Sequence, residues 1–424
     1  MIELLKLFTF IMLTIIVLSA ILNILKGYSD SIYIVKIVFY IFFVLPLLFD
    51  LFIGIPDYKR YPGVREASND ELTNFIYCIY IIFVSVIWYF TGRSKKRDVI
   101  FNKFSLTRNI SSKRRRFLIT LLYFCSIFPL VLLIFSPEPM FYLEYGGIVE
   151  LEDKAVKDFH NYIALCTVMS VVSCAGLLMI SNKLKPFMIL YVFSITFISS
   201  WLNGKRAVVS IACILLVYAF WSKGLLKGKR LIVAGLLVIL IFSSFTLLYQ
   251  YNVRDINIAE DYFYENIRID YGRDDVTKLT IYSELNPDKS RILEFRGQSI
   301  LFYLTAFVPR ESFPNKPWPY AVYMTSSVLG LTNNTYIGWG MTTSWLEEAI
   351  ANFSWGGMVL GPLFISLICR IGDSCISPII PPITMLLGSL MLTVHPIAFW
   401  YVWVVWIGFI MYEKIKILTT AKRT

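Results

Sequence analysis

Arginine and acidic side chains gather in one polar stretch of an otherwise apolar sequence, residues 251–319. Within it, the segment IRIDYGRDDV (267–276) places two arginines and three aspartates in ten positions. Arginine carries a permanent charge on a planar fork that binds phosphate or carboxylate through paired hydrogen bonds. A nearby carboxylate can position or deprotonate a hydroxyl. The stretch therefore indicates binding of an anionic group, such as a lipid diphosphate. The alternative is that these arginines only pair with the adjacent acids, which outnumber the basic residues over 251–298.

Two further groups of residues extend this chemistry. In NGKRA (203–207), Lys205 and Arg206 stand between two apolar runs, where neither charge is needed to set topology. Ionisable residues at membrane depth usually mark a site, although at a helix end they also reach the interface by snorkelling. In TSWLEEAIANFSWGGMVLGP (343–362), Glu347 and Glu348 precede an apolar span. A carboxylate there can act as a general base or cap the helix N-terminus.

These observations give a set of candidate site residues. The candidate catalytic carboxylates are Asp274, Asp275, Glu347 and Glu348. The candidate substrate-binding residues are Lys205, Arg206, Arg254, Arg268, Arg273, Arg291, Arg296 and Arg310. The two histidines, His160 and His395, are far apart in the sequence and suggest no metal site, with His160 a minor candidate base. No phosphate-binding glycine loop or dinucleotide fingerprint occurs. We expect no metal and no cofactor.

The composition indicates what must position these residues. Of the 424 residues, 57% are hydrophobic and 16% charged, and the mean hydropathy is +0.65. This predicts an all-α, polytopic transmembrane bundle, because apolar segments of about 20 residues span a bilayer as helices. About 11–12 spans are expected in one integral membrane domain covering residues 1–424. The predicted spans lie near residues 4–25, 31–54, 74–91, 117–136, 161–180, 184–202, 205–221, 231–250, 345–369, 374–393 and 396–413.

The charge distribution predicts orientation. The connector 92–116 carries ten Lys or Arg residues and one acid, Asp98, and such connectors stay in the cytoplasm. Counting helices from there places residues 251–344 outside, as a large extracytoplasmic loop, and the N-terminus outside as well. Within that loop, QSILFYLTAFV (298–308) is too short to span and is predicted to be an interfacial or re-entrant helix. Since most of the net charge of +11 is explained by topology, no nucleic-acid partner is expected.

Four features together resemble the bacterial O-antigen and capsular repeat-unit polymerases of the Wzy type. They are Arg206 after a short outer loop, the GRDD segment of the large loop, PRESFPNKP (309–317) and EEAIANFSWGG (347–357). The resemblance covers roughly residues 180–370. It implies a glycosyltransferase in the bacterial cytoplasmic membrane that joins undecaprenyl-diphosphate-linked oligosaccharide units, one as donor and one as acceptor, into a surface polysaccharide such as lipopolysaccharide O-antigen or capsule. By position within those segments, it implies roles for Arg206, Arg273 and Arg310. A chain-length regulator protein is a possible partner, besides membrane lipid.

The residue chemistry is compatible with this expectation. Fixed arginines can stabilise the negative charge that develops on a leaving diphosphate without a metal, and a carboxylate can receive the proton of the attacking hydroxyl. Two alternatives stay open. An O-antigen ligase resembles a pattern with a catalytic histidine in the large loop, and no histidine occurs between residues 161 and 394. A lipid-linked oligosaccharide flippase or transporter would carry charges through the interior of several helices.

Overall fold

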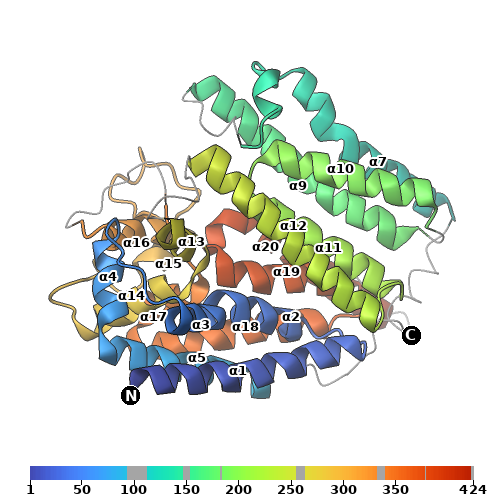
Figure 1. Cartoon of the computed structure of the whole chain (residues 1–424). Helices are drawn as coiled ribbons and strands as arrows, with labels where there is room; N and C mark the ends of the chain where they lie inside the picture. The colour runs from blue at the N-terminus through green and yellow to red at the C-terminus, as the bar shows by residue number, and fades with distance from the viewer. Residues whose placement is uncertain are drawn as a thin grey trace. The chain divides into compact units, whose positions relative to one another are not determined.

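The computed structural model describes residues 1–92, 112–146, 153–181, 184–254, 263–331, 340–377 and 379–421. These residues form helices and connections without a β-strand, and the chain divides into two compact units (Figure 1). Unit 1 combines both ends of the chain, residues 1–24, 28–97 and 264–424, whereas unit 2 consists of residues 25–27 and 98–263. The candidate carboxylates and the arginines from Arg268 onward belong to unit 1. Lys205, Arg206 and Arg254 belong to unit 2.

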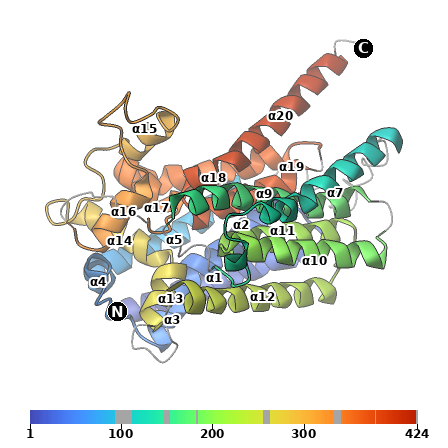
Figure 2. The same ribbon diagram turned by 90° about the horizontal axis from the view of Figure 1, so that it is seen from above.

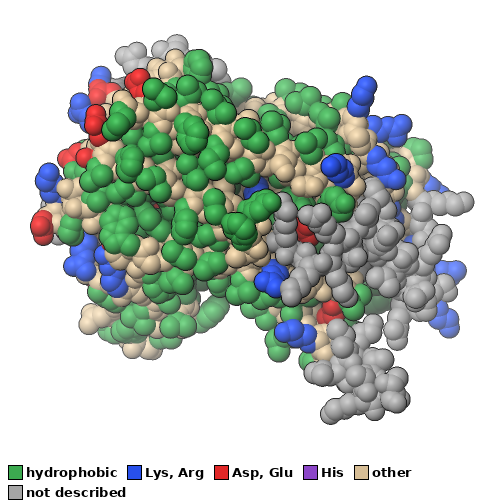
Figure 3. Space-filling view, turned by 90° about the horizontal axis from the view of Figure 1, so that it is seen from below, with side chains coloured by type: hydrophobic (Ala, Val, Ile, Leu, Met, Phe, Trp, Pro, Cys, Tyr) green, Lys and Arg blue, Asp and Glu red, His purple; other side chains and the backbone are tan. Residues whose placement is uncertain are grey.

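The apolar segments form helices where the sequence predicts them. In the part of the chain that the structure describes, nine helices are long and apolar enough to cross a membrane. The two other predicted spans form shorter apolar helices, Ala207–Ser222 and Ile380–Thr393. The protein is thus a multi-pass, helical membrane protein. Apolar side chains make up much of the face shown in Figure 3.

The helices of unit 1 that carry its spans come from both ends of the chain. They are α1 (Ile2–Leu25), α2 (Ser31–Phe39), the π-helix η1 (Tyr40–Val44), α3 (Leu45–Phe52), α5 (Glu71–Thr91), α17 (Trp345–Phe353), α18 (Gly357–Asp373), α19 (Ile380–Thr393) and α20 (Trp400–Ala421). Short helices complete the unit: α4 (Pro62–Asn69), α13 (Phe263–Tyr271), α14 (Asp274–Leu285), α15 (Gln298–Leu304) and α16 (Tyr320–Val328). The predicted large loop is therefore mostly short helices in its described part, and α12 of unit 2 continues to Arg254. Its position outside the membrane stays a prediction.

The short helices of unit 1 share an apolar core. Tyr58, Ile269, Leu279, Tyr320 and Met324 are all at most 2% exposed and pack in one cluster. This cluster joins the connector after α3 to α13, α14 and α16. It explains why a polar region of the sequence folds compactly, since each short helix buries an apolar side against its neighbours. Figure 2 shows α15 at the edge of this group.

Unit 2 is a bundle of longer helices: α7 (Ser112–Ile134), α9 (Lys154–Ile180), α10 (Pro186–Asn203), α11 (Arg206–Ser222) and α12 (Lys229–Arg254). Hydroxyl groups join α7, α9 and α10, because Ser170 Oγ donates to the Ser126 carbonyl (2.6 Å) and lies 2.9 Å from Ser199 Oγ. Such hydrogen bonds hold helices together where no hydrophobic effect acts between them.

Candidate functional site

Arg268 lies at the centre of a buried ion-pair network in unit 1. Its guanidinium donates to both carboxylate oxygens of Asp274, at 3.0 Å each. Its Nη2 also contacts Asp50 at 2.9 Å and Asp275 at 3.3 Å. All four side chains are at most 2% exposed. The alternative raised by the sequence, that the arginines of this segment pair with nearby acids, is what the structure shows for Arg268.

Two lysines complete the network. Lys278 Nζ contacts Asp274 at 2.8 Å and Asp50 at 3.1 Å, and Lys6 Nζ lies 3.5 Å from Asp50. Three cations thus face three carboxylates, and the opposite charges compensate for the loss of hydration on burial. Arg268 and Asp274 are thus bound to each other, and a role for either in binding or catalysis stays a prediction.

A glycine makes this packing possible. Gly272 precedes the two aspartates, and a Cβ at this position would lie 2.6 Å from Asp274 Oδ1 and 2.7 Å from the Arg268 carbonyl. No side chain fits in this space without moving either the carboxylate or the backbone. The glycine of the GRDD segment therefore has a packing role, because it leaves the space in which Arg268 and Asp274 form their hydrogen bonds.

The two aspartates of α14 differ in their surroundings. Although burial alone would raise it, the Arg268 and Lys278 cations hold the pKa of Asp274 well below its usual range. Asp275 contacts Arg268 through one oxygen and accepts a hydrogen bond from the Tyr58 hydroxyl at 2.5 Å. Burial raises the pKa of Asp275 to about 7, against the opposing effect of Arg268. Asp275 is consequently the aspartate of this pair that can exchange a proton near neutral pH.

The raised pKa of Asp275 predicts a pH dependence of stability. Its carboxyl has a pKa of about 3.9 when unfolded, so the folded state binds more protons between that value and about 7. Stability therefore falls as pH rises through this window. We expect Asp275→Asn, which keeps an acceptor for Tyr58, to remove this part of the loss. The check is the apparent melting temperature of purified wild type and variant at about pH 5 and about pH 8. Equal pH slopes in the two proteins would contradict the assignment.

Arg273 is held by a different device, which begins with a proline. In a regular α-helix the Phe42 carbonyl would accept from the N–H of residue 46, but Pro46 has none. The helix widens into the π-turn η1 at this point, and the Phe42 carbonyl accepts instead from the Arg273 N–H at 2.9 Å. The guanidinium, in a residue only 3% exposed, donates to the carbonyls of Asp270, Gly272 and Thr393. Arg273 thus joins the start of α14 to the end of α19.

Glu347 lies close to this arginine. Thr277, about one turn after Arg273 on α14, has its Oγ1 3.5 Å from Glu347 Oε2. The same carboxylate forms a capping box with Ser344 at the start of α17, so the capping alternative raised by the sequence is what the structure shows for this glutamate. The N-terminal turns of α14 and α17 therefore meet, although they lie 70 residues apart in the chain.

Glu348 points to the short helix α15. Its Oε1 accepts from Ser299 Oγ at 2.6 Å and from the Tyr303 hydroxyl at 2.5 Å. The glutamate is fully buried, and its Oε2 has no hydrogen-bond partner among the described residues. A buried carboxylate oxygen in this state keeps full capacity to accept a hydroxyl group.

The other candidates are placed separately. Arg296 pairs with Glu284 and donates to the Ala351 carbonyl at 2.9 Å, while Arg291 is exposed. Arg310 lies 3.6 Å above the Trp318 ring and donates to the carbonyls of Lys316 and Pro317. The contacts of Arg310 therefore lie within the proline-rich segment itself.

In unit 2, Lys205 is exposed and precedes α11. The side chains of Arg206 and Arg254 lie outside the described residues. His160 is buried, with its Nδ1 3.2 Å from the Tyr142 hydroxyl. The roles expected of these residues stay predictions.

Sequence reasoning missed four residues of the network: Lys6, Asp50, Tyr58 and Lys278. Asp50 could have been found, because it is a single acid inside an apolar span, and such residues are rare and paired when they occur. The same holds for Lys6. Lys278 reads as an ordinary i,i+4 partner of Asp274 on a helix surface, and nothing local distinguishes Tyr58.

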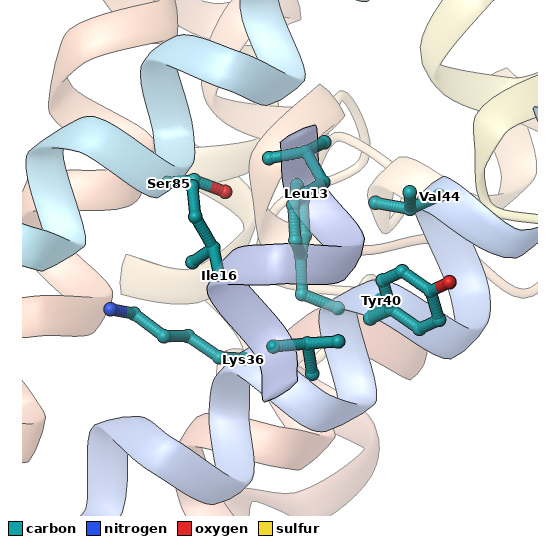
Figure 4. Close-up of a pocket in the computed structure, with 8 residues that line it drawn as sticks. Leu13, Ile16, Lys36, Tyr40, Val44 and Ser85 are labelled. Carbon is teal, nitrogen blue, oxygen red and sulfur yellow. The ribbon is translucent and has the colours of Figure 1, made fainter. Parts of the chain in front are cut away.

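A small cavity lies within the span helices of unit 1. Leu13, Lys36, Tyr40 and Ser85 are among its lining residues (Figure 4), and its volume is about 10 Å³. This is about the space of one water molecule. It is too small for a sugar or a diphosphate.

No protein-family model matches the chain, and no curated protein or solved structure matches it either. Only the residues themselves therefore indicate a function. Their arrangement brings the GRDD segment and the EEAIANF segment together in unit 1, with Arg273, Thr277 and Glu347 at their meeting point.

Proposed function

We propose that this membrane protein is a glycosyltransferase that polymerises polyprenyl-diphosphate-linked oligosaccharide repeat units into a surface polysaccharide, on the outer face of the bacterial cytoplasmic membrane. The observation that carries the proposal is the meeting of α14 and α17. It places the buried carboxylate of Glu347 3.5 Å from the Thr277 hydroxyl, about one helical turn from Arg273. Glycosyl transfer from a lipid diphosphate needs these two kinds of group together.

In this proposal the two segments divide the work. Arg273 stabilises the negative charge on the departing diphosphate, and Glu347 or Glu348 receives the proton of the attacking hydroxyl. The acceptor oxygen bonds to the anomeric carbon of the donor as the bond to the diphosphate breaks. The Arg268 network holds the start of α14, and hence Arg273, in place. Asp274 is a weaker candidate for the base because both of its oxygens accept from Arg268.

A second candidate function is transport of the lipid-linked oligosaccharide across the membrane. Lys6, Lys36 and Asp50 favour it, because all three are buried within candidate spans. Charges in the interior of several spans are what a transporter for an anionic substrate needs. Lys6 and Asp50 neutralise each other within the Arg268 network, however, and Lys36 lines a cavity that holds no more than one water.

The experiment that separates these functions is the chain length of the surface polysaccharide in a bacterial strain lacking the gene. Polymerase function predicts single repeat units on the normal acceptor, with the ladder of longer chains restored by the wild-type gene. Accumulation of lipid-linked units on the cytoplasmic face would establish transport instead. An unchanged ladder would refute both functions.

A further inference from the structure

Three polar atoms on one face of α17 have no hydrogen-bond partner among the described residues, although all three are buried. They are Trp345 Nε1, Glu348 Oε2 and Asn352 Oδ1. Spacings of three and four residues put these positions on the same side of a helix. Each buried polar atom left without a partner destabilises the fold, because it has given up its hydrogen bonds to water. Three together on one face therefore call for an explanation.

The chemistry of these atoms indicates what they would bind. One is an N–H donor, one a carboxylate oxygen and one an amide oxygen, so the face offers both donors and acceptors. The glutamate and the asparagine are at most 2% exposed. Trp345 adds an indole ring, which packs against Phe364 with ring centroids 5.2 Å apart. A ligand with several hydroxyl groups on an apolar ring frame satisfies all of these groups at once, and a saccharide is such a ligand.

The other oxygen of Glu348 already shows this binding mode. Its Oε1 accepts two hydroxyl groups, from Ser299 and Tyr303, and Asn352 Nδ2 donates to Ser299 Oγ at 2.7 Å. Both hydroxyl-bearing residues belong to α15, which packs against α17. Protein hydroxyls thus bind one oxygen of Glu348, while the other has no partner among the described residues.

The helix α15 is only seven residues long. It follows Gly297, whose φ of +80° favours glycine, and its last residue, Leu304, is 79% exposed. Pro309, five residues after the end of α15, begins the proline-rich segment. The contacts of Ser299 and Tyr303 with Glu348 involve no residue of the Arg268 network.

We propose that the Trp345, Glu348 and Asn352 face of α17 is a saccharide site, and that the Ser299 and Tyr303 hydroxyls occupy it until sugar hydroxyls replace them. On the basis of the proposed polymerase function, the saccharide bound at this face is the acceptor oligosaccharide. The donor diphosphate is assigned to Arg273.

The test measures binding without requiring turnover. The full-length protein, purified in detergent, is titrated calorimetrically with oligosaccharide released by mild acid from the surface polysaccharide of the host strain. We expect Glu348→Gln to weaken binding by about tenfold or more, the equivalent of one lost hydrogen bond to a charged group. Tyr303→Phe keeps the ring and removes a competing hydroxyl, so we expect it to strengthen binding several-fold. Glu66→Gln, the same chemical change on an exposed residue of α4, serves as the matched control and leaves binding unchanged.

The opposite sign of the two effects distinguishes the site from a structural contact. If Tyr303→Phe weakens binding as Glu348→Gln does, or if wild type binds no released oligosaccharide, the proposal is overturned. Equal binding by wild type and Glu348→Gln overturns it too. Should Glu348→Gln fail to fold, the Tyr303→Phe titration still decides. The polysaccharide ladder of the gene-deleted strain is a separate readout, so failure of the polymerase function and failure of this site are distinguishable.

Discussion

Replacing Arg268 with alanine is expected to lower the free energy of unfolding by about 3–5 kcal/mol, because it leaves buried carboxylates without their shared cation. In the wild type, Arg268 contacts Asp50, Asp274 and Asp275 within 3.3 Å. After the substitution, three carboxylates face only two lysines in a region closed to water. The expected drop in apparent melting temperature is roughly 10 °C or more for a unit of this size.

The matched control is Arg65→Ala. Arg65 also pairs with an aspartate, Asp57, at 3.1 Å, but both side chains are more than half exposed. Pairs of this kind contribute about 0–1 kcal/mol. Melting is followed by size-exclusion chromatography of heated, detergent-solubilised protein. If Arg268→Ala melted at the same temperature as Arg65→Ala, the network would not hold unit 1 together.

Arg273→Ala is expected to have the largest effect on activity. Removing one fixed donor from a developing negative charge typically lowers a rate by about 10²–10³-fold. In the gene-deleted strain, a copy carrying Arg273→Ala should therefore restore few or no long polysaccharide chains. The measurement is the ladder of the surface polysaccharide on a gel, with the amount of protein in the membrane determined by immunoblot.

Arg273 also has structural contacts, and the design must separate the two effects. The hydrogen bond from its backbone N–H to the Phe42 carbonyl does not depend on the side chain, so the alanine and lysine variants both keep it. Arg273→Lys also keeps a positive charge but loses the planar fork. A loss of long chains with normal protein level and normal melting temperature in Arg273→Lys indicates a role in the reaction. Arg65→Ala again serves as the arginine control. A full ladder from Arg273→Ala would remove this residue from the site.

The helical framework was predictable because each membrane helix is indicated by the apolarity of its own segment. Every predicted apolar segment forms a helix in the described residues, including those over Ala207–Ser222 and Ile380–Thr393, which are shorter than a full span. In lipid, a segment must satisfy its own backbone hydrogen bonds, so continuous apolarity is enough to predict a helix. Which side of the membrane each connection occupies depends on charges in connectors and stays a prediction.

The site was predictable only as a list of residues. The sequence singles out the GRDD segment and the glutamates of α17, but pairing across the chain has no local signal. Arg268 contacts Asp50, which lies 218 residues away in the sequence. Thr277 and Glu347, also in contact, are separated by 70 residues. These contacts depend on how the short helices pack together. The sequence pattern of each short helix is too weak to predict that packing. Only the contacts show that Arg268 pairs with three carboxylates, whereas the Arg273 guanidinium donates to backbone carbonyls.

The assembly of unit 1 from both ends of the chain has a consequence for biogenesis. Lys6 and Asp50 enter the membrane early, but Arg268 is synthesised 218 residues after Asp50. At roughly 5–20 residues per second, the ribosome needs on the order of 10–40 s to supply it. During this interval the two early charges have only each other, at 3.5 Å in the finished protein. A nascent chain that stops before α13 therefore lacks the arginine and the lysine that complete the charge network around Asp50 in its first spans.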